Sequence, residues 1–107
     1  MAAVIGVSTH RDEQVVTADV GEADYIAVGP VFVTATKLNA EPVVGLEGVR
    51  RARALTRKPL VAIGGITLGN ARSVIDAGAD SVAVIGGLFV PGRSVREVAE
   101  DFLEILR

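Results

Sequence analysis

The sequence predicts an α/β domain in which four parallel strands are each followed by a helix. Three observations predict it: four short apolar runs without polar alternation, helical spacing between them, and a glycine or serine at the end of each run. Strands buried on both faces of a parallel sheet have this pattern. The chain has 107 residues, half of them hydrophobic, which predicts one domain over residues 1–107 with a core of its own.

The predicted strands are short and rich in valine, isoleucine and alanine. They are Ala3 to Ser8, Tyr25 to Gly29, Leu60 to Gly65 and Ser81 to Gly87. An internal echo links two of them, because EADYIAV, beginning at Glu22, matches GADSVAV, beginning at Gly78. The repeating unit is therefore a pair of βα modules.

The first two helices are predicted at 12–20 and 46–55. The weaker pattern is 12–20, because its β-branched residues lower helix propensity. The second has a narrow apolar stripe that stops before Pro59, made by Leu46, Val49, Ala52 and Leu55.

The last two helices have clearer signals. Ala71, Val74 and Ile75 share one helical face, and Gly78 is placed to end that helix in a left-handed conformation. The final helix has an apolar face and begins with a capping-box pattern. The face is Val98, Phe102 and Ile105, and the box is Ser94 with Glu97.

Two architectures fit four such modules. One is a small open sheet with helices on both faces, and the other is half of an eight-stranded (βα)8, or TIM, barrel, which usually takes ~250 residues. The unusual residues gather after the strands, where barrel active sites lie, and this favours the half-barrel. A half-barrel exposes its interior and two strand edges, so we expect a homodimer that completes eight strands, or pairing with a missing N-terminal half.

Composition excludes several classes of function. The formal net charge is −2 and the arginines are scattered apart from one short run, which argues against a nucleic-acid partner. Without cysteine and with one histidine, the chain has neither disulfides nor a thiolate or histidine-rich metal site. We expect a soluble cytoplasmic protein without membrane contact, since no run approaches the ~20 apolar residues of a membrane span.

Two glycine pairs follow the third and fourth strands, Gly64 with Gly65 and Gly86 with Gly87. Glycine lets backbone N–H groups approach an anion closely, and a helix N-terminus behind the loop adds partial positive charge. A single pair is more typical of a tight turn. Two pairs in adjacent modules favour a phosphate cup.

The loop after the second strand contains Thr34, Thr36 and Lys37, two hydroxyl donors and an ammonium group that suit phosphate or pyrophosphate. The alternative is a solvated loop. Ser8 ends the first strand and points toward the same rim if the register holds, or else caps the following helix. His10 is more typical of a structural or exposed histidine and is left out of the site.

Five segments together resemble the thiamine-phosphate synthases and their thiazole tautomerase relatives, which share a (βα)8 barrel. The segments are IGVSTH from Ile5, ADYIAVGPVFVTATK from Ala23, PVVGLEGV from Pro42, AIGGIT from Ala62 and AGADSVAVIGGLF from Ala77. They occur in family order over essentially the whole chain. They correspond to strands five to eight of the family's barrel.

The resemblance implies a reaction that joins hydroxymethylpyrimidine pyrophosphate to thiazole phosphate as pyrophosphate leaves. It implies that Ser8 and Lys37 act as catalytic residues on the pyrophosphate, where they would stabilise developing negative charge. Thr34 and Thr36 would line the thiazole phosphate side. The backbone of the strand ends would complete the cup, at Gly64, Gly65, Ile85 and Gly86.

The chain departs from the family at three positions. Val33 replaces a proline of the loop, Gly86 replaces a serine, and Pro30 occupies the place of the tautomerases' histidine, which favours the synthase branch.

The complete family enzyme is expected to use Mg²⁺, through two aspartates and a Gln-x-Arg-x-Lys segment that this sequence lacks. We expect five of its aspartates to face the other end of the strands and to leave this chain without bound metal. These five are Asp12, Asp19, Asp24, Asp76 and Asp80.

The expected function is thus a synthase-like half that binds phosphate or pyrophosphate and is inactive alone. Two alternatives stay open: a non-catalytic assembly module, as a remnant or an engineered half-barrel, and another phosphate-binding barrel such as a thiazole tautomerase.

Overall fold

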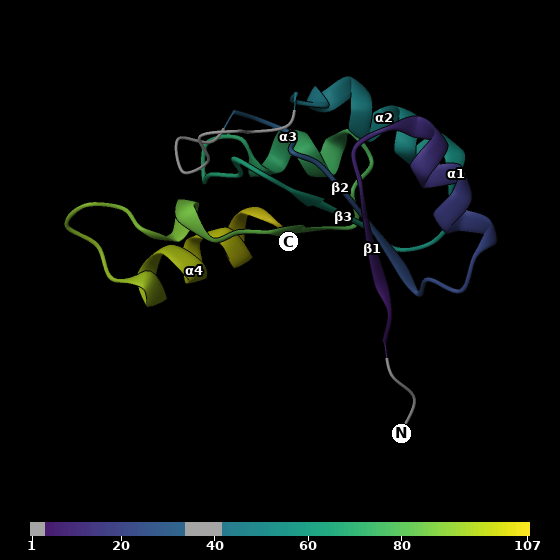
Figure 1. Ribbon diagram of the computed structural model, residues 1–107. Coiled ribbons are helices and arrows are strands. Elements are labelled where there is room, and N and C mark those ends of the chain that lie inside the picture. The colour runs from purple at the N-terminus through teal and green to yellow at the C-terminus, as the bar shows by residue number, and fades with distance from the viewer. Residues whose placement is uncertain (1–3, 34–41) are drawn as a thin grey trace.

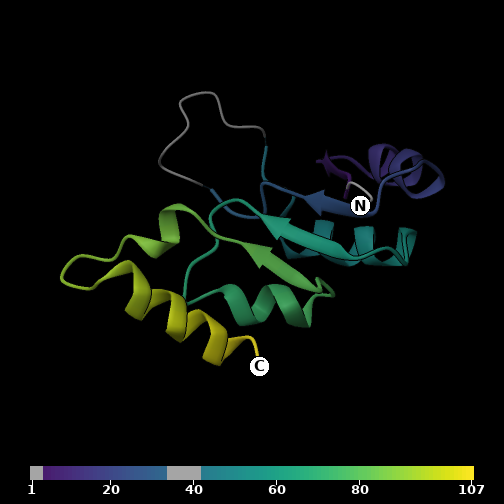
Figure 2. The same cartoon turned by 90° about the horizontal axis from the view of Figure 1, so that it is seen from below.

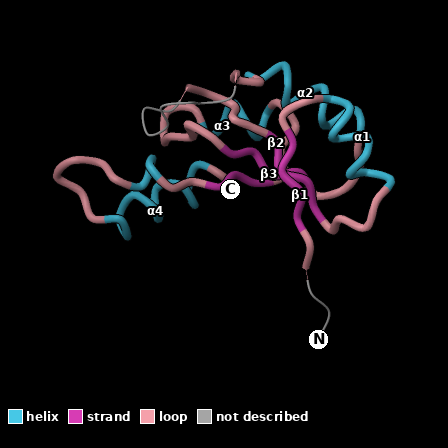
Figure 3. Tube along the Cα trace, viewed as in Figure 1, coloured by secondary structure: helices cyan, strands magenta, loops and turns pink. Residues whose placement is uncertain are grey.

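The strands form one parallel sheet in the order β1-β2-β3-β4. The computed structural model describes residues 4–33 and 42–107. The strands are β1 (Gly6–Thr9), β2 (Tyr25–Val28), β3 (Leu60–Ile63) and β4 (Ser81–Ala83). Figure 3 shows them running side by side through the centre of the molecule. All three pairings are parallel, as the sequence predicted.

Each strand is followed by a helix, and the predicted βα order is confirmed. The helices are α1 (Asp12–Val20), α2 (Gly45–Leu55), α3 (Ala71–Asp76) and α4 (Val95–Ile105), with a short 3₁₀ helix, η1 (Gly86–Leu88), before α4. Because the strand order never reverses, right-handed crossovers place every helix on the same face of the sheet. Figure 2 shows the strand arrows pointing the same way, and Figure 1 shows α1, α2 and α3 along one side of them.

Burial follows this one-sided cover. Ile26, Val28, Leu60 and Ala62 point toward the helices and are at most 3% exposed. Their neighbours point to the other face and are more open; Ile63, for example, is 38% exposed. A sheet covered on both faces, as in the open-sheet alternative, would bury both sets.

All four strands are shorter than predicted, and the fourth differs most. Pairing of β1 with β2 starts only at Gly6, opposite Tyr25, although Ile5 still accepts hydrogen bonds from the backbone of Asp24 and Tyr25. At the other edge β4 stops at Ala83, and the chain turns into η1. The central strand β3 also stops early, at Ile63, because Gly64 and Gly65 have positive φ and turn the chain out of the strand.

The helix ends agree with the sequence signals. Gly78 has φ +125°, and hydrogen bonds from Gly78 N–H to Ile75 O and from Ala79 N–H to Val74 O form a Schellman motif after α3. At the start of α4, Ser94 accepts from the Glu97 N–H while the Glu97 carboxylate accepts from the Ser94 N–H. Both boundary predictions are confirmed.

A polar cluster joins the elements at the amino-terminal end of the strands. Arg53 on α2 donates to the Asp80 carboxylate at 2.8 Å and to the carbonyls of Thr56 and Lys58. Asp80 also accepts the Leu60 N–H at 2.8 Å. That backbone hydrogen bond is the main cause of the lowered pKa of Asp80, and Arg53 adds to it.

Candidate phosphate-binding site

The loop after β3 requires its two glycines. Gly64 has φ +99° and Gly65 has φ +69°. A Cβ on Gly64 would lie 2.6 Å from Pro30, and one on Gly65 would lie 2.8 Å from the Cβ of Phe32. The turn explanation therefore accounts for this pair by backbone conformation and close packing.

The loop after β4 is different, because Gly86 has no positive φ, and a Cβ added there would have no neighbouring atom within 4 Å. Gly87 does need to be glycine, since a Cβ there would overlap the Ile66 carbonyl oxygen. Gly86 and Ile85 are both exposed, the latter by 74%. Neither conformation nor packing within the described residues accounts for the glycine at position 86.

Both loops contain backbone N–H groups without a backbone acceptor among the described residues. Among residues 4–33 and 42–107, no backbone carbonyl accepts a hydrogen bond from the N–H of Gly64, Gly65, Gly86 or Gly87. The two loops follow β3 and β4, which pair directly with each other. Such donors at one edge of a sheet are what an anion needs.

The segment after β2 is held against the first of these loops. Val31 N–H donates to Ile63 O and Phe32 N–H donates to Gly64 O, both at 3.0 Å. After the loop that follows β2, the Val44 N–H donates a hydrogen bond to Pro30 O at 2.8 Å. The predicted site residues Thr34, Thr36 and Lys37 fall between these anchors and lie outside the described residues.

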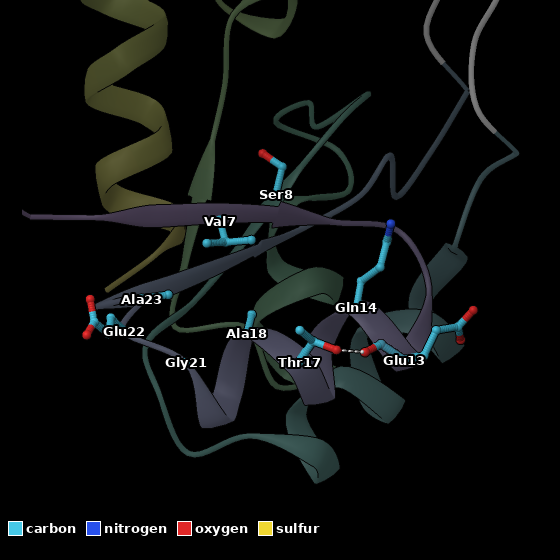
Figure 4. A pocket seen from close by; sticks show the side chains of 9 residues that line it. All are labelled: Val7, Ser8, Glu13, Gln14, Thr17, Ala18, Gly21, Glu22 and Ala23. Atoms are coloured by element: carbon cyan, nitrogen blue, oxygen red, sulfur yellow. Dashed lines mark hydrogen bonds between the residues drawn. The ribbon is translucent and has the colours of Figure 1, made fainter.

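Ser8 faces the side of the sheet opposite the helices. Figure 4 shows its side chain on the other side of β1 from Val7, and the residue is exposed. It does not cap α1, because the Gln14 side chain accepts from the backbone N–H groups of His10 and Arg11 instead. Ser8 lies on β1 and Ile85 follows β4. These two outer strands lie about 14 Å apart across a flat sheet of this spacing, so one chain does not join the two residues in a single small site.

An open groove lies beside β1. It has a volume of about 450 Å³ and lies between the strand and α1, lined by Val7, Gln14, Thr17, Ala18 and Gly21 among others. In Figure 4 these side chains surround the gap from both elements. The exposed edge of β1 was predicted for a half-barrel, but the groove was not, because its lining depends on how α1 packs beside the strand.

One aspartate lies at a different end from the one predicted. Asp12 begins α1, directly after β1, so it lies at the carboxyl end of the strands. Its carboxylate is taken up by the Arg51 guanidinium, whose Nε lies 3.2 Å from Oδ2. The other four aspartates end helices or precede strands, as predicted.

Within the part of the chain that the structure describes, no group of three or more His, Cys, Asp or Glu residues could hold a metal ion. The residues present do not fit the Mg²⁺ site that the family resemblance implies. No described helix has the length and apolar character needed to cross a membrane.

Comparisons with known proteins match this chain to thiamine-phosphate synthases. The family model described as thiamine monophosphate synthase matches residues 1–88. A thiamine-phosphate synthase of Koribacter versatilis is 58% identical over 102 residues, covering 95% of this chain and 47% of the relative. One of Methanoregula boonei is 47% identical over 85 residues, covering 79% and 39%.

A solved structure agrees with the sequences. Thiamine phosphate pyrophosphorylase from Pyrococcus furiosus superposes with a TM-score of 0.81 at 37% identity, covering 96% of this chain and 48% of that one. The chain thus spans about half the length of the relatives it matches, and its fold is half of a (βα)8 barrel. With the four parallel βα modules and the glycine loops in family order, the chain belongs to the thiamine-phosphate synthase family.

Proposed function

We propose that this chain binds phosphate or pyrophosphate at the carboxyl ends of β3 and β4, as the phosphate-binding half of a thiamine-phosphate synthase in the cytoplasm. The observation that supports this most is that, among the described residues, no backbone carbonyl accepts from the N–H groups of Gly64, Gly65, Gly86 and Gly87 in two adjacent loops. Gly86 adds to it, because nothing in the described fold requires glycine there.

Lys37 and the two threonines fit this proposal by chain geometry. Val33 adjoins Gly65, since a Cβ on Gly65 would lie 2.9 Å from the Val33 carbonyl oxygen. Lys37 follows four residues later in the chain, in the same loop after β2. A lysine side chain then supplies the charge that the backbone donors lack.

In the family reaction, Ser8 and Lys37 would stabilise negative charge on the leaving pyrophosphate, while Thr34 and Thr36 would hold the thiazole phosphate. The isolated chain is proposed to bind without catalysing, because its described residues do not form the family's magnesium site. Catalysis would need a second set of four strands, supplied by a second copy or by an N-terminal half.

Thermal unfolding tests binding. Inorganic phosphate, pyrophosphate and thiazole phosphate, each at millimolar concentration, should raise the melting temperature, because a ligand that binds only the folded state stabilises it. Sulfate and chloride at equal ionic strength serve as controls. No rise beyond these controls would contradict the proposal.

The competing function is a non-catalytic assembly module. It is favoured by Gly64 and Gly65, whose conformation and packing explain them without any ligand. A panel of phosphosugars in the same unfolding assay identifies a third case, another phosphate-handling barrel, if one of them stabilises the protein more than thiazole phosphate does.

A further inference from the structure

Most of the exposed large apolar side chains lie on the first and last modules, and the exceptions are Val33, Val43 and Ile63. Of the large apolar residues that are exposed in the described chain, none lies on α2 or α3. At one end Val4 is 74% and Val7 38% exposed, and at the other Phe89 is 70% and Leu103 66% exposed. The two ends of the array therefore both need cover.

The two ends are also complementary. The groove beside β1 opens on the side of α1 that is away from α2, where it can receive apolar side chains of a neighbouring helix. The last helix, α4, carries Val95, Ala99 and Leu103 at a spacing of four residues, and packs on α3 by another face. Its stripe and the groove match in chemistry, since both are largely apolar.

The strand register fixes how two such ends meet. Ladder pairs run from Ser8 through Ala27 and Val61 to Ser81. Ser8 is near the end of β1 (Gly6–Thr9), whereas Ser81 is the first residue of β4 (Ser81–Ala83). The strands thus slide toward their carboxyl ends from β1 to β4, as tilted barrel strands do.

In a (βα)8 barrel the register shifts by about eight residues on one full circuit of the eight strands. Each set of four strands therefore accounts for a shift of about four residues. The strand that follows β4 should therefore meet Ser81 with the residue four before Ser8, which is Val4. In Figure 1 the start of β1 projects beyond its neighbours. There the Ile5 N–H donates to the Asp24 carboxylate at 2.7 Å, which holds the segment extended beside β2.

We propose that two copies of this chain close an eight-stranded barrel in which Val4 of one copy pairs with Ser81 of the other. By the same register, Ser8 of one copy lies beside Ile85 of the other and adds its hydroxyl to the N–H groups of the Gly86 loop. Each anion site is then composite, built from both copies. This rests on the proposed phosphate binding, which it deepens.

The second copy is the occupant that the chain itself argues for. The β1 end of each chain has a groove, and the β4 end has the apolar stripe on α4. In a dimer of two chains, the same strand register joins β4 to β1 at both contacts between the copies. A twofold pair of four-stranded sheets reaches the eight strands of a closed barrel with no edge left over.

Cysteine cross-linking tests the register, since the chain has no cysteine of its own. Copies with Val4→Cys are mixed with copies carrying Ser81→Cys and oxidised mildly. Adjacent parallel strands bring such residues within disulfide reach. We expect a covalent dimer that a reductant dissolves.

The matched control pairs Ser81→Cys with Ser8→Cys, the unshifted register, about 13 Å away along the strand. It should give no covalent dimer. Cross-linking of the control pair instead, or of neither pair, would overturn the proposal, as would a monomer by light scattering at micromolar concentration.

Phosphate titration of the same proteins separates this inference from the proposed function. Ser8→Ala should weaken phosphate binding about tenfold, as expected for one hydrogen bond to a charged group, while Ser81→Ala should not. Phosphate binding by a monomer would contradict the composite site alone. A cross-linked dimer that binds no phosphate would contradict the proposed function but not the seam.

Discussion

Gly64 and Gly86 are the same residue type in neighbouring loops, yet the structure needs them for different reasons. At Gly64 the backbone has φ +99° and Pro30 lies against the position of a side chain. At Gly86 the position is open. A substitution at Gly64 should therefore lower the stability of the fold, whereas one at Gly86 should weaken ligand binding.

A pair of alanine variants measures that separation. Gly64→Ala should lower the free energy of unfolding by about 1–3 kcal/mol, the usual range for strained backbone. Gly86→Ala should leave unfolding within about 0.5 kcal/mol but weaken phosphate binding, because its Cβ stands where the anion approaches. Urea unfolding and phosphate titration give both numbers, and equal loss of stability in the two variants would contradict this assignment.

Asp80 should make folding sensitive to acid. Its pKa is lowered by the Leu60 N–H and by Arg53, so the carboxylate form is favoured in the folded state. That stabilisation is present above its unfolded pKa of about 3.9 and is lost as pH falls through the lower folded value.

Asp80→Asn should therefore destabilise the protein at pH 7 by about 1 kcal/mol, a modest effect because the side chain is 57% exposed. It should also flatten the stability loss below about pH 4. Asp76→Asn is the matched control, since its partner Arg72 lies on the same exposed helix surface. Equal effects of the two substitutions on urea unfolding would refute a special role for Asp80.

At the scale of single elements, sequence signals were most reliable where local chemistry decides. The Schellman glycine at Gly78 and the capping box of Ser94 and Glu97 lie where they were predicted. The carboxyl ends of β3 and β4 were not, because the apolar pattern continues into loop residues that leave the sheet. Asp12 was assigned to the wrong end although the helix predicted over 12–20 already begins at this residue, directly after the first strand.

The capping box offers a direct measurement on α4. Ser94→Ala should cost about 1 kcal/mol of unfolding free energy, because the Glu97 N–H loses its acceptor. Ser94→Asp keeps an acceptor at the cap and should restore most of it. If alanine and aspartate behave alike in thermal unfolding, the cap does not stabilise this helix.

At the scale of the whole molecule, the sequence predicted the half-barrel from its module order and its strand-end glycines, and the fold agrees. The candidate site could be predicted only in part. Gly64, Gly65, Ile85 and Gly86 lie in the two adjacent loops, but Ser8 belongs to the opposite edge strand, a separation that residue types alone do not reveal.

Closure by a second copy predicts which surface substitutions matter. Leu103→Lys places a charge on the apolar stripe of α4 and should shift the dimer toward monomer at least tenfold in dissociation constant. Ala54→Lys, at an exposed position on α2, should not. Sedimentation equilibrium compares them, and similar dissociation constants would argue against a seam at α4.

The uniform slide of the strands has a consequence for assembly from high concentration. Pairing the last strand of one chain with the first strand of the next does not by itself fix the number of chains in the assembly. Only the curvature of the sheet closes it after two chains. Where that curvature relaxes, the same contact can add chains without end and produce ribbons. Slow dilution of the protein from denaturant should therefore favour closed dimers, and rapid concentration of the protein should favour ribbons.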